Sequence, residues 1–412
     1  MYVALKGNAL IGQSGGPTIV INASMVGAIE AAERHPEIEH FYGALCGLTG
    51  VLNEEMIELF REDDDVIRQM RYTPSAGLGT CRLKPKESDL ERCMEVFKAH
   101  NIRYFFYNGG NDSQLTCHLI SELAKGSDWE MQVIGIPKTI DNDLVITDNC
   151  PGFGSAARYA AWAVQCAARD AMAFGNVEVV EVMGRHAGWL TGATQCGRKE
   201  PWMAPHLVYL PEVTVDPDKF ISDCQNAYDE YGYLVVAVSE GFTFGESEQA
   251  TTSEKLDEFG HARLGGVAEA LGHLIEESIG VRARTDCLGN LQRAFSPCMS
   301  KVDNDEAYAV GEDAVNRAVA GENDVMITIK RKQNDPFEFE TATTSLMSVA
   351  DKTKLVPDEW INADRNGVTD EFIEYCLPLL NTPVSDLPAG LPQYPVFQKH
   401  FAERKLGEHA RE

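Results

Sequence analysis

One short stretch of the sequence combines a lysine with two carboxylates. Lys138, Asp141 and Asp143 lie in the segment 137–143, directly after an apolar, β-branched run. Carboxylates two positions apart in an extended loop can take separate tasks, one accepting a hydroxyl proton and the other binding a divalent cation. A structural Asx loop or a calcium-type loop is the plain alternative. The neighbouring Lys138 favours a phosphoryl-transfer site over a simple cation site.

Two glycine pairs follow other apolar runs and precede helix-like stretches. They are Gly15-Gly16 and Gly109-Gly110. Glycines at such positions let backbone N–H groups approach a phosphate near the positive end of a helix. An ordinary strand-to-helix turn is the alternative for the first pair. Asp112, which follows the second pair, is also typical of a helix cap, and a carboxylate there repels phosphate unless a cation stands between them.

Further charged residues lie at or near glycine-containing turns. Arg185 could stabilise transferring phosphoryl oxygens with its planar guanidinium, whereas the adjacent His186 is more typical of a structural histidine. Glu240 ends a long apolar run and could accept hydrogen bonds from sugar hydroxyls. Three arginines have the surroundings of phosphate-binding arginines, although each alone also fits a surface position: Arg82, Arg284 and Arg293.

Two nucleotide-binding patterns are excluded. The sequence GFGSAA at 152–157 fits the dinucleotide pattern G-x-G-x-x-A, but it follows Pro151 and not a strand, so its required context is missing. No G-x-x-x-x-G-K-[ST] loop occurs in the sequence, which excludes a P-loop enzyme.

The composition limits the class of protein. The chain has 412 residues, of which 44% are hydrophobic, enough for two or three globular units. Its net charge of −27 disfavours nucleic acid and anionic membrane surfaces as partners. Because no signal peptide is recognised, the expected location is the cytoplasm. Eleven cysteines without C-x-x-C pairs then indicate reduced core thiols and neither disulfides nor zinc ligands. No signal peptide and no membrane-spanning run is recognised.

Short apolar runs alternate with amphipathic stretches along the chain, which predicts parallel sheets covered by helices. The predicted strands are 9–13, 104–107, 133–136, 177–182, 207–210 and 234–238. The predicted helices are 19–33, 89–99, 114–124, 156–173, 219–228, 267–278, 307–320 and 369–380, with a hairpin at 325–344 and a proline-containing tail at 387–412. Ligands in such folds bind at the carboxyl ends of the strands, where the residues above lie.

We therefore expect an α/β protein with two Rossmann-like lobes. The first lobe is expected at 1–150, joined by parts of 281–345, and the second at 151–280. A C-terminal helix and tail are expected at 346–412. The long helical stretch after Pro151 is expected to cross from one lobe to the other.

The ordered motifs resemble the phosphofructokinase family over residues 9–319. The family pattern has a glycine pair after the first strand, then Gly-Gly-Asp-x-Ser/Thr, Thr-Ile-Asp-Asn-Asp, Met-Gly-Arg, a Glu-Gly strand end and Leu-Gly-x-x-Gln-Arg. The matching segments here are Gly15-Gly16, 109–113, 139–143, 183–185, Glu240-Gly241 and 288–293. One motif alone is weak, but all of them in order make coincidence implausible.

The resemblance implies a role for each matching residue. Asp141 would be the base that deprotonates the sugar 1-hydroxyl, with Lys138 and Arg185 as further catalytic residues. The implied donor-binding residues are Gly15, Gly16, Arg82, Gly110, Asp112, Ser113 and Lys138. The implied sugar-phosphate contacts are Thr139, Asp141, Met183, Gly184, Arg185 and Glu240, with Arg284 and Arg293 binding the 6-phosphate. The implied Mg²⁺ ligands are Asn111, Asp112 and Asp143.

Three positions depart from the family pattern. Asn111, Asn176 and Asn290 stand where the family has an aspartate, an arginine and often a histidine. These differences affect the metal contact and the sugar site. In the family, the arginine matching Arg284 reaches the neighbouring subunit's site, so the resemblance implies a homo-oligomer, most simply a homodimer.

The choice of phosphoryl donor depends on two residues. Family members that use ATP have glycine at the positions of Asp112 and Lys138, and members that use pyrophosphate have aspartate and lysine. A side chain at Asp112 would fill space that the α-phosphate of a nucleotide needs, while Lys138 could hold pyrophosphate directly.

The resemblance therefore implies reversible phosphoryl transfer from pyrophosphate to fructose 6-phosphate, a glycolytic and gluconeogenic reaction. The alternatives are an ATP-dependent phosphofructokinase and a catalytically inert, sugar-phosphate-binding regulatory subunit. Other acceptors, such as sedoheptulose 7-phosphate, stay open at this point.

Overall fold

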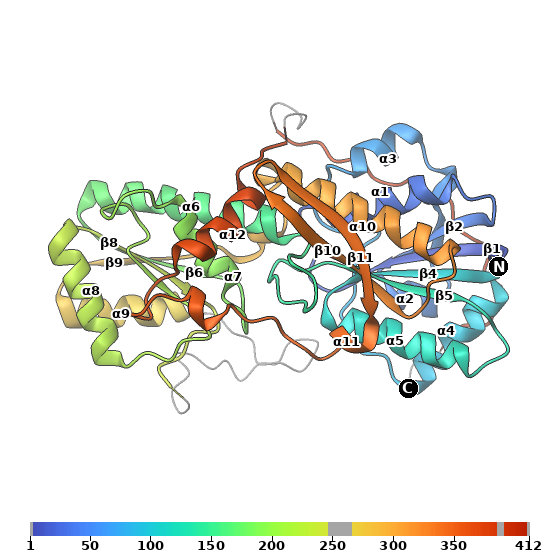
Figure 1. The fold of residues 1–412 in the computed structure, drawn as a ribbon, viewed down its shortest axis with the longest axis horizontal. Coiled ribbons are helices and arrows are strands. Elements are labelled where there is room, and N and C mark those ends of the chain that lie inside the picture. Colours follow the sequence, from blue (N-terminus) through green and yellow to red (C-terminus); the bar gives the residue numbers. More distant parts are fainter. Residues whose placement is uncertain (1–2, 246–265, 385–390, 410–412) are drawn as a thin grey trace.

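Two β-sheets, each covered by helices, form two lobes that lie side by side (Figure 1). The computed structural model describes residues 3–245, 266–384 and 391–409. The strand order is β11-β10-β5-β4-β1-β2-β3 in the seven-stranded sheet and β7-β8-β6-β9 in the four-stranded sheet. The predicted α/β fold with two lobes is therefore confirmed.

The first sheet brings three strand ends together. Its strands are β1 (Gly7–Gln13), β2 (Ile38–Ala44), β3 (Met56–Glu58), β4 (Ile102–Gly109), β5 (Gln132–Pro137), β10 (Val325–Asn334) and β11 (Phe337–Ser345). The neighbours β1, β4 and β5 are parallel, and their registers pair Gln13 with Asn108 and Gly109 with Pro137. The turns that follow these strands therefore start at one edge of the sheet, as is usual for ligand sites in α/β folds.

Helices bury both faces of the first sheet. They are α1 (Ile21–Ala32), α2 (Leu48–Leu52), α3 (Asp64–Met70), α4 (Glu87–Ala99), α5 (Asn111–Lys125), α10 (Lys301–Val319) and α11 (Leu346–Val349). The core on one face contains residues of α1 and α10, and the core on the other contains residues of α4, α5 and α11. Helices α1 and α10 approach so closely that a Cβ on Gly27 or Gly311 would collide with the facing backbone.

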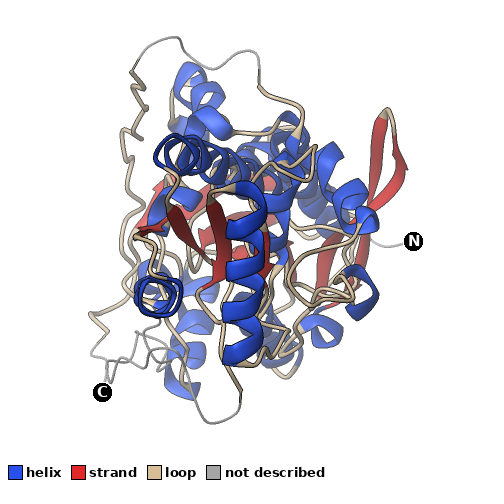
Figure 2. Cartoon of the chain, turned by 90° about the vertical axis from the view of Figure 1, so that its left-hand side faces the viewer, coloured by secondary structure: helices blue, strands red, loops and turns tan. Residues whose placement is uncertain are grey.

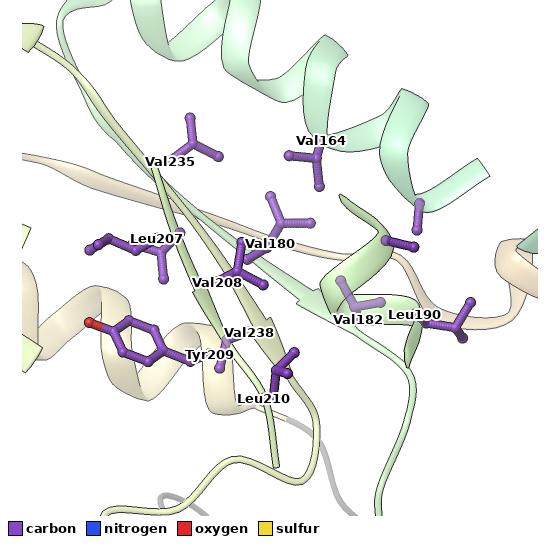
Figure 3. Close-up of a cluster of buried hydrophobic side chains, with 14 of the residues drawn as sticks. Val164, Val180, Val182, Leu190, Leu207, Val208, Tyr209, Leu210, Val235 and Val238 are labelled. Carbon is purple, nitrogen blue, oxygen red and sulfur yellow. The ribbon is translucent and has the colours of Figure 1, made fainter. Parts of the chain in front are cut away.

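The second sheet is parallel throughout and rich in valine. Its strands are β6 (Val177–Val182), β7 (Leu207–Tyr209), β8 (Leu234–Ser239) and β9 (Ala283–Cys287), and its helices are α6 (Phe153–Phe174), α7 (Trp189–Ala193), α8 (Pro217–Tyr231) and α9 (Val267–Ile279). Figure 2 shows this lobe in front, with helices over the sheet. Val164 of α6 faces Val180 and Val235 in the core (Figure 3). Strands buried on both faces favour β-branched side chains, which explains the sequence pattern.

The C-terminal part of the chain contacts both lobes. Helix α12 (Asp370–Leu380) packs against α6 and α7 (Figure 1). The described part of the tail, 391–409, runs along the first lobe, where Phe401 forms a β-bridge with Ile57 of β3. Residues 385–390 and 410–412, part of which fall in the expected tail, lie outside the described residues. The division into 1–150 with parts of 281–345, 151–280 and 346–412 stays a prediction.

Every predicted strand and helix is present, with ends that differ by a few residues. The largest shift concerns α10, which begins at Lys301 and not at 307, because its first turns bury the polar residues Asp303, Asn304 and Glu306. The prediction missed β2, β3 and β9. Strand β9 is half exposed and has no apolar pattern, and in β2 the exposed polar residues Glu39 and His40 follow the first residue and interrupt the apolar run.

Two statements on the class of protein also follow. All eleven cysteines are free thiols, as expected. Among the described helices, none is both long and apolar enough to cross a membrane.

Candidate active site

The loop after β5 carries Asp141 and Asp143 on either side of Asn142. Asn142 adopts a left-handed backbone with φ of 55°, a conformation that asparagine tolerates better than most residues. Its side chain fixes the loop, since Oδ1 accepts from the backbone N–H of Cys150 at 3.0 Å and Nδ2 donates to the Tyr375 hydroxyl at 2.8 Å. The loop that carries the two carboxylates is therefore fixed to the rest of the fold by the side chain of Asn142, which lies between them.

Lys138 connects this loop to the glycine turn after β1. Its Nζ donates to the carbonyl oxygen of Gly16 at 2.7 Å, and its side chain is only 3% exposed. Burial and the positive charges of Arg293 and Arg82 lower the pKa of Lys138 to about 7, against the opposing effect of Asp141 and Asp143. An anion bound beside this ammonium would favour its charged form.

The position of Asp141 in the sequence, close to Lys138, predicts a carboxylate that stays ionised at neutral pH, and the structure does not support this prediction. Burial, together with the charges of Asp143 and Glu240, raises the pKa of Asp141 to about 7, although Arg293 and Lys138 oppose the shift. The correction has a physical cause that the sequence hides, because Glu240 and Arg293 come from distant segments. A carboxyl whose pKa lies near neutrality is well matched to proton transfer at physiological pH.

The opposite wall of the site carries Arg185, Glu240 and Arg293. Glu240 follows β8, and its Oε1 accepts from the backbone N–H of Gly184 at 3.4 Å. Burial raises the pKa of Glu240, while the Gly184 hydrogen bond and the charges of Arg185 and Arg293 oppose this. A Cβ on Gly16 would lie 3.0 Å from the Arg293 guanidinium carbon, so this glycine allows the arginine to approach the turn. Residues of both lobes therefore meet at one site.

These residues line a single cavity of about 350 Å³. It combines positive side chains suited to phosphate groups with carboxylates suited to a proton and a metal. The predicted residues that line it are Gly15, Gly16, Arg82, Gly110, Asn111, Asp112, Ser113, Lys138, Thr139, Asp141, Asp143, Arg185, Glu240 and Arg293. The cavity thus contains the donor and metal residues expected from the sequence together with most of the sugar contacts.

Three predicted residues do not line this cavity. Met183 and Gly184 lie directly beside it, next to Arg185. Arg284 is on β9 at the outside of the second lobe, where it forms an ion pair with Asp170 and lies 5.1 Å from the centre of the Phe174 ring. Within one chain, Arg284 is therefore not part of the site.

Asp112 lines the cavity beside Asn111 and Ser113, and its carboxylate has a partner that the sequence did not suggest. Its Oδ1 is 3.7 Å from Nζ of Lys84, and both side chains are about half exposed. The interpretation of Asp112 as a helix cap is wrong, because Gly110 is the N-cap of α5 and Asp112 lies within the first turn. Its carboxylate is stabilised there by the positive end of the helix.

The oxygen atoms near Asp143 suit Mg²⁺. Asn111 Oδ1 is buried and accepts no hydrogen bond from the described residues, while its Nδ2 lies 3.4 Å from Asp143 Oδ2. Burial raises the pKa of Asp143, as expected for a carboxylate whose charge is not fully compensated by the protein. A buried acceptor without a donor next to a carboxylate is the hard oxygen environment that Mg²⁺ prefers.

Several residues of the cavity were missed by sequence reasoning. Its lining also includes Ser14, Leu83, Thr116, Ile140, His186 and Thr353. His186 was interpreted as structural, yet it faces the cavity together with Arg185. Thr353 belongs to a segment without any motif, so only the fold could reveal it.

The dismissed dinucleotide pattern has a structural role. The N-terminus of α6, which contains this pattern, is capped by a carboxylate of the same chain. Asp303 accepts hydrogen bonds from the backbone N–H groups of Gly152 and Ser155, at 2.7 and 2.9 Å. A phosphate group has no access to N–H groups that are already bound in this way.

Comparisons with known proteins agree with the geometry. A model of the family described as "Phosphofructokinase" matches residues 8–318. The chain is 40% identical to a pyrophosphate–fructose 6-phosphate 1-phosphotransferase of Halomonas elongata, over 97% of this chain and 98% of the relative. It is 42% identical to the enzyme of the same name from Rhodospirillum rubrum, over 92% and 96%. Among solved structures, a pyrophosphate-dependent phosphofructokinase from Nitrosospira multiformis superposes with a TM-score of 0.91 at 38% identity, covering 98% of this chain and all of that one.

Proposed function

Since the chain belongs to the phosphofructokinase family, we propose that it is a pyrophosphate-dependent 6-phosphofructokinase. It transfers a phosphoryl group from pyrophosphate to the 1-hydroxyl of fructose 6-phosphate and releases phosphate and fructose 1,6-bisphosphate. The relatives named for this reaction match nearly the full length of the chain, which supports the donor and the acceptor together.

One observation carries the proposal. The buried ammonium of Lys138 lies between the glycine turn after β1 and the loop that holds Asp141, in a cavity that both lobes line. From the cavity, a small anionic donor would contact the glycine turn and the lysine, and the Asp141 carboxylate would contact the acceptor. An ATP site of the family type has no need of a lysine in this position.

The residues of the chain would divide the reaction between them. Asp141 accepts the proton of the sugar 1-hydroxyl as the phosphoryl group arrives, and its raised pKa suits this transfer near neutrality. Lys138 and Arg185 stabilise negative charge on the transferring and leaving phosphate oxygens, and Arg82 contributes at the donor side. Glu240, Thr139 and Arg293 orient the sugar phosphate.

Mg²⁺ would be held by Asp143, Asn111 and Asp112. When bound, the ion neutralises charge on the donor's phosphate oxygens. Asn111 in place of an aspartate leaves this set with less negative charge than the family pattern, so we expect comparatively weak metal binding.

We propose that the active enzyme is a homo-oligomer, most simply a homodimer. Arg284 is remote from the cavity of its own chain but exposed on the outer edge of the second sheet. In an oligomer it would contact the 6-phosphate in the neighbouring subunit's site. A symmetric dimer completes both sites by the same contact. We place the enzyme in the cytoplasm, because its highly charged substrates do not cross membranes.

A matrix of donors and acceptors tests the function. Purified protein is assayed with pyrophosphate or ATP against fructose 6-phosphate and sedoheptulose 7-phosphate, in both directions and with Mg²⁺. We expect the highest kcat/KM with pyrophosphate and fructose 6-phosphate, and detectable reverse transfer from fructose 1,6-bisphosphate to phosphate. A preference for ATP would contradict the proposed donor. Sugar-phosphate binding without turnover in any combination would instead indicate a regulatory subunit.

A further inference from the structure

A short segment of the C-terminal region crosses between the lobes beside the active site. This segment, residues 350–356, is called the strap below. It starts after α11, whose Leu346 and Val349 belong to a core of the first lobe, and ends at Val356, which is buried in the core of the second lobe. Thr353 of the strap lines the active-site cavity. Among the described residues beyond the family match, the strap thus contributes the one that lines the active-site cavity.

Lys354 of the strap binds the loop that carries Asp141 and Asp143. Its backbone N–H donates to the carbonyl oxygen of Asp143 at 2.7 Å. Its Nζ donates to the carbonyl oxygens of Thr147 and Asp148, both at 3.1 Å, and lies 3.4 Å from Oδ1 of Asn142. One side chain thus binds both the start and the end of the loop.

The same lysine is anchored on the second lobe. Its carbonyl oxygen accepts from the indole N–H of Trp189 at 2.8 Å, and its Nζ lies 5.3 Å from the centre of that ring, a cation–π distance. Glu212 holds the end of the strap, because its Oε1 accepts from the backbone N–H groups of Gly188 and Val356. Trp189 is buried, so this anchor is rigid.

The charge of Lys354 also acts on the carboxylate proposed for the metal. The charges of Lys354 and Lys138 both favour a negative charge on the Asp143 carboxylate. Loss of the Lys354 charge would leave the loop carbonyls without their donor and Asp143 with less compensation.

We propose that Lys354 is a positioning residue for the reaction: from the strap, it holds the 142–148 loop in the geometry in which Asp141 and Asp143 act, and it fixes that loop relative to Trp189 of the second lobe. The expected change in kcat rests on the proposed function, whereas the expected change in hydrogen exchange of the loop does not. It adds to the catalytic machinery a residue that touches neither substrate and that lies outside the matched family region.

The test uses the full chain and three lysine variants. Lys354→Met keeps the length of the side chain but removes its charge and donors, Lys354→Arg keeps the charge, and Lys352→Met is the matched control on the same strap. Lys352 is exposed and its Nζ contacts only the Ser348 carbonyl in the hydrogen bonds resolved for the described residues. Because a small misplacement of reacting groups costs about 100-fold in rate, we expect Lys354→Met to lower kcat about 30- to 100-fold. KM values should stay within about threefold.

Lys354→Arg and hydrogen exchange of the loop together distinguish a residue that positions the loop from one that only stabilises the fold. Lys354→Arg should recover kcat to within about tenfold of the parent, and Lys352→Met should match the parent. Hydrogen exchange of peptides covering 142–149 should be faster in Lys354→Met than in both the parent and Lys352→Met, with unchanged exchange in the second-lobe core. Tyr375→Phe, which removes the hydroxyl that contacts Asn142 and Asp148, provides a second variant with the same expected pattern if Lys354→Met does not fold.

The inference is overturned if Lys354→Met has the parent's kcat, or if its loop exchanges no faster than the parent's. A lower melting temperature with unchanged kcat would likewise reduce Lys354 to a purely structural residue. If the parent itself shows no activity with pyrophosphate and fructose 6-phosphate, the proposed function fails. The exchange comparison then still decides whether Lys354 holds the loop.

Discussion

Lys138 Nζ lies 2.7 Å from the carbonyl oxygen of Gly16, which joins the loop after β5 to the glycine turn after β1. The contact holds the ammonium in the wall of the cavity, and under the proposed function this ammonium would contact the outer phosphate of pyrophosphate. Because the side chain is only 3% exposed, water screens its charge little, and a bound anion would change the electrostatic surroundings of the ammonium strongly.

The first prediction concerns Asp141 as the general base. Asp141→Ser removes the proton acceptor but leaves the loop fixed by Asn142, so kcat should fall about 100-fold or more. The dissociation constant for fructose 6-phosphate should change less than about threefold. Steady-state kinetics and equilibrium binding measure the two quantities. Asp128→Ser, at an exposed carboxylate remote from the cavity, is the control, and near-parent turnover in Asp141→Ser would remove Asp141 from this role.

The second prediction is a bell-shaped pH profile of kcat/KM. Asp141 must be deprotonated to accept a proton, and its pKa is raised to about 7, so activity should fall as the pH drops below about 7. Lys138 must be protonated to bind the donor, and its pKa is lowered to about 7, so activity should also fall as the pH rises above this range. Lys138→Arg keeps its charge at high pH and should remove the alkaline limb only. If activity still falls at alkaline pH in Lys138→Arg, a titratable group other than Lys138 causes that decrease, and the assignment to Lys138 is wrong.

The third prediction places Arg284 in the neighbouring subunit's site. Arg284→Ala should raise the KM for fructose 6-phosphate about tenfold or more, although the residue is outside the cavity of its own chain. Asp141→Ser subunits and Arg284→Ala subunits, both impaired at low substrate, are then mixed, dissociated and reassembled. Hybrid dimers contain one site with both native residues, so a 1:1 mixture should regain about a quarter of the parent activity at low substrate. No recovery, or sedimentation of the active parent as a monomer, contradicts the shared site.

The fourth prediction concerns stability at low pH. His206 is buried, its Nδ1 accepts from the Val235 backbone N–H at 3.1 Å, and Nε2 lies 3.3 Å from the Trp202 carbonyl oxygen, so the fold needs the neutral ring. Burial lowers the pKa of His206 to about 4. The unfolded chain therefore binds the proton first, and the free energy of unfolding should drop by about 2–3 kcal/mol as the pH falls from about 6.5 to about 4.

His206→Gln isolates this contribution from that of other groups. The amide oxygen can accept from Val235 but does not titrate, so the variant should lose less stability than the parent over the same pH range. Denaturant unfolding at several pH values measures the difference. Identical slopes for parent and variant would show that His206 is not the group responsible.

The sequence predicted the strand ends that form the site, and the reason is physical. Gly15-Gly16, Gly109-Gly110 and Asp141 each follow an apolar run typical of a buried strand, and these parallel strands end at the same edge of the first sheet. Glu240 follows a similar run, the strand β8 of the second sheet. Lys84 and Lys354 could not be predicted in this way. Each reaches the site by a tertiary contact from a segment with no motif and no periodic pattern.

The raised pKa of Asp141 was equally beyond the sequence. Lys138, three residues away in the chain, suggested an ionised carboxylate. The structure adds Asp143, Glu240 and burial, and together these outweigh the attraction. Local spacing gives the partners within a loop, but the balance of charge depends on which distant residues share the cavity.

The last prediction concerns the barrier to ATP at the donor end of the cavity. Asp112 lies in the first turn of α5, with its carboxylate at the cavity edge 3.7 Å from Lys84. A nucleotide α-phosphate in this region would meet both the volume and the charge of that carboxylate, and two anions at close range repel by about 1 to 4 kcal/mol near a protein surface. Lys138→Gly should therefore impair pyrophosphate use without admitting ATP, because Asp112 remains.

Asp112→Gly should admit ATP weakly, since it removes the carboxylate's repulsion and its volume. The double change to glycine should admit ATP better, because the space of both side chains becomes free. Asp112→Asn separates the two effects: it keeps the volume but not the charge, so ATP use in this variant measures the electrostatic part alone. The measured quantity is the ratio of kcat/KM for ATP and pyrophosphate in the parent and the four variants. If the parent prefers pyrophosphate but Asp112→Gly shows no ATP use, the barrier lies elsewhere in the cavity, and Arg82 with the glycine turn at Gly15 becomes the next region to change.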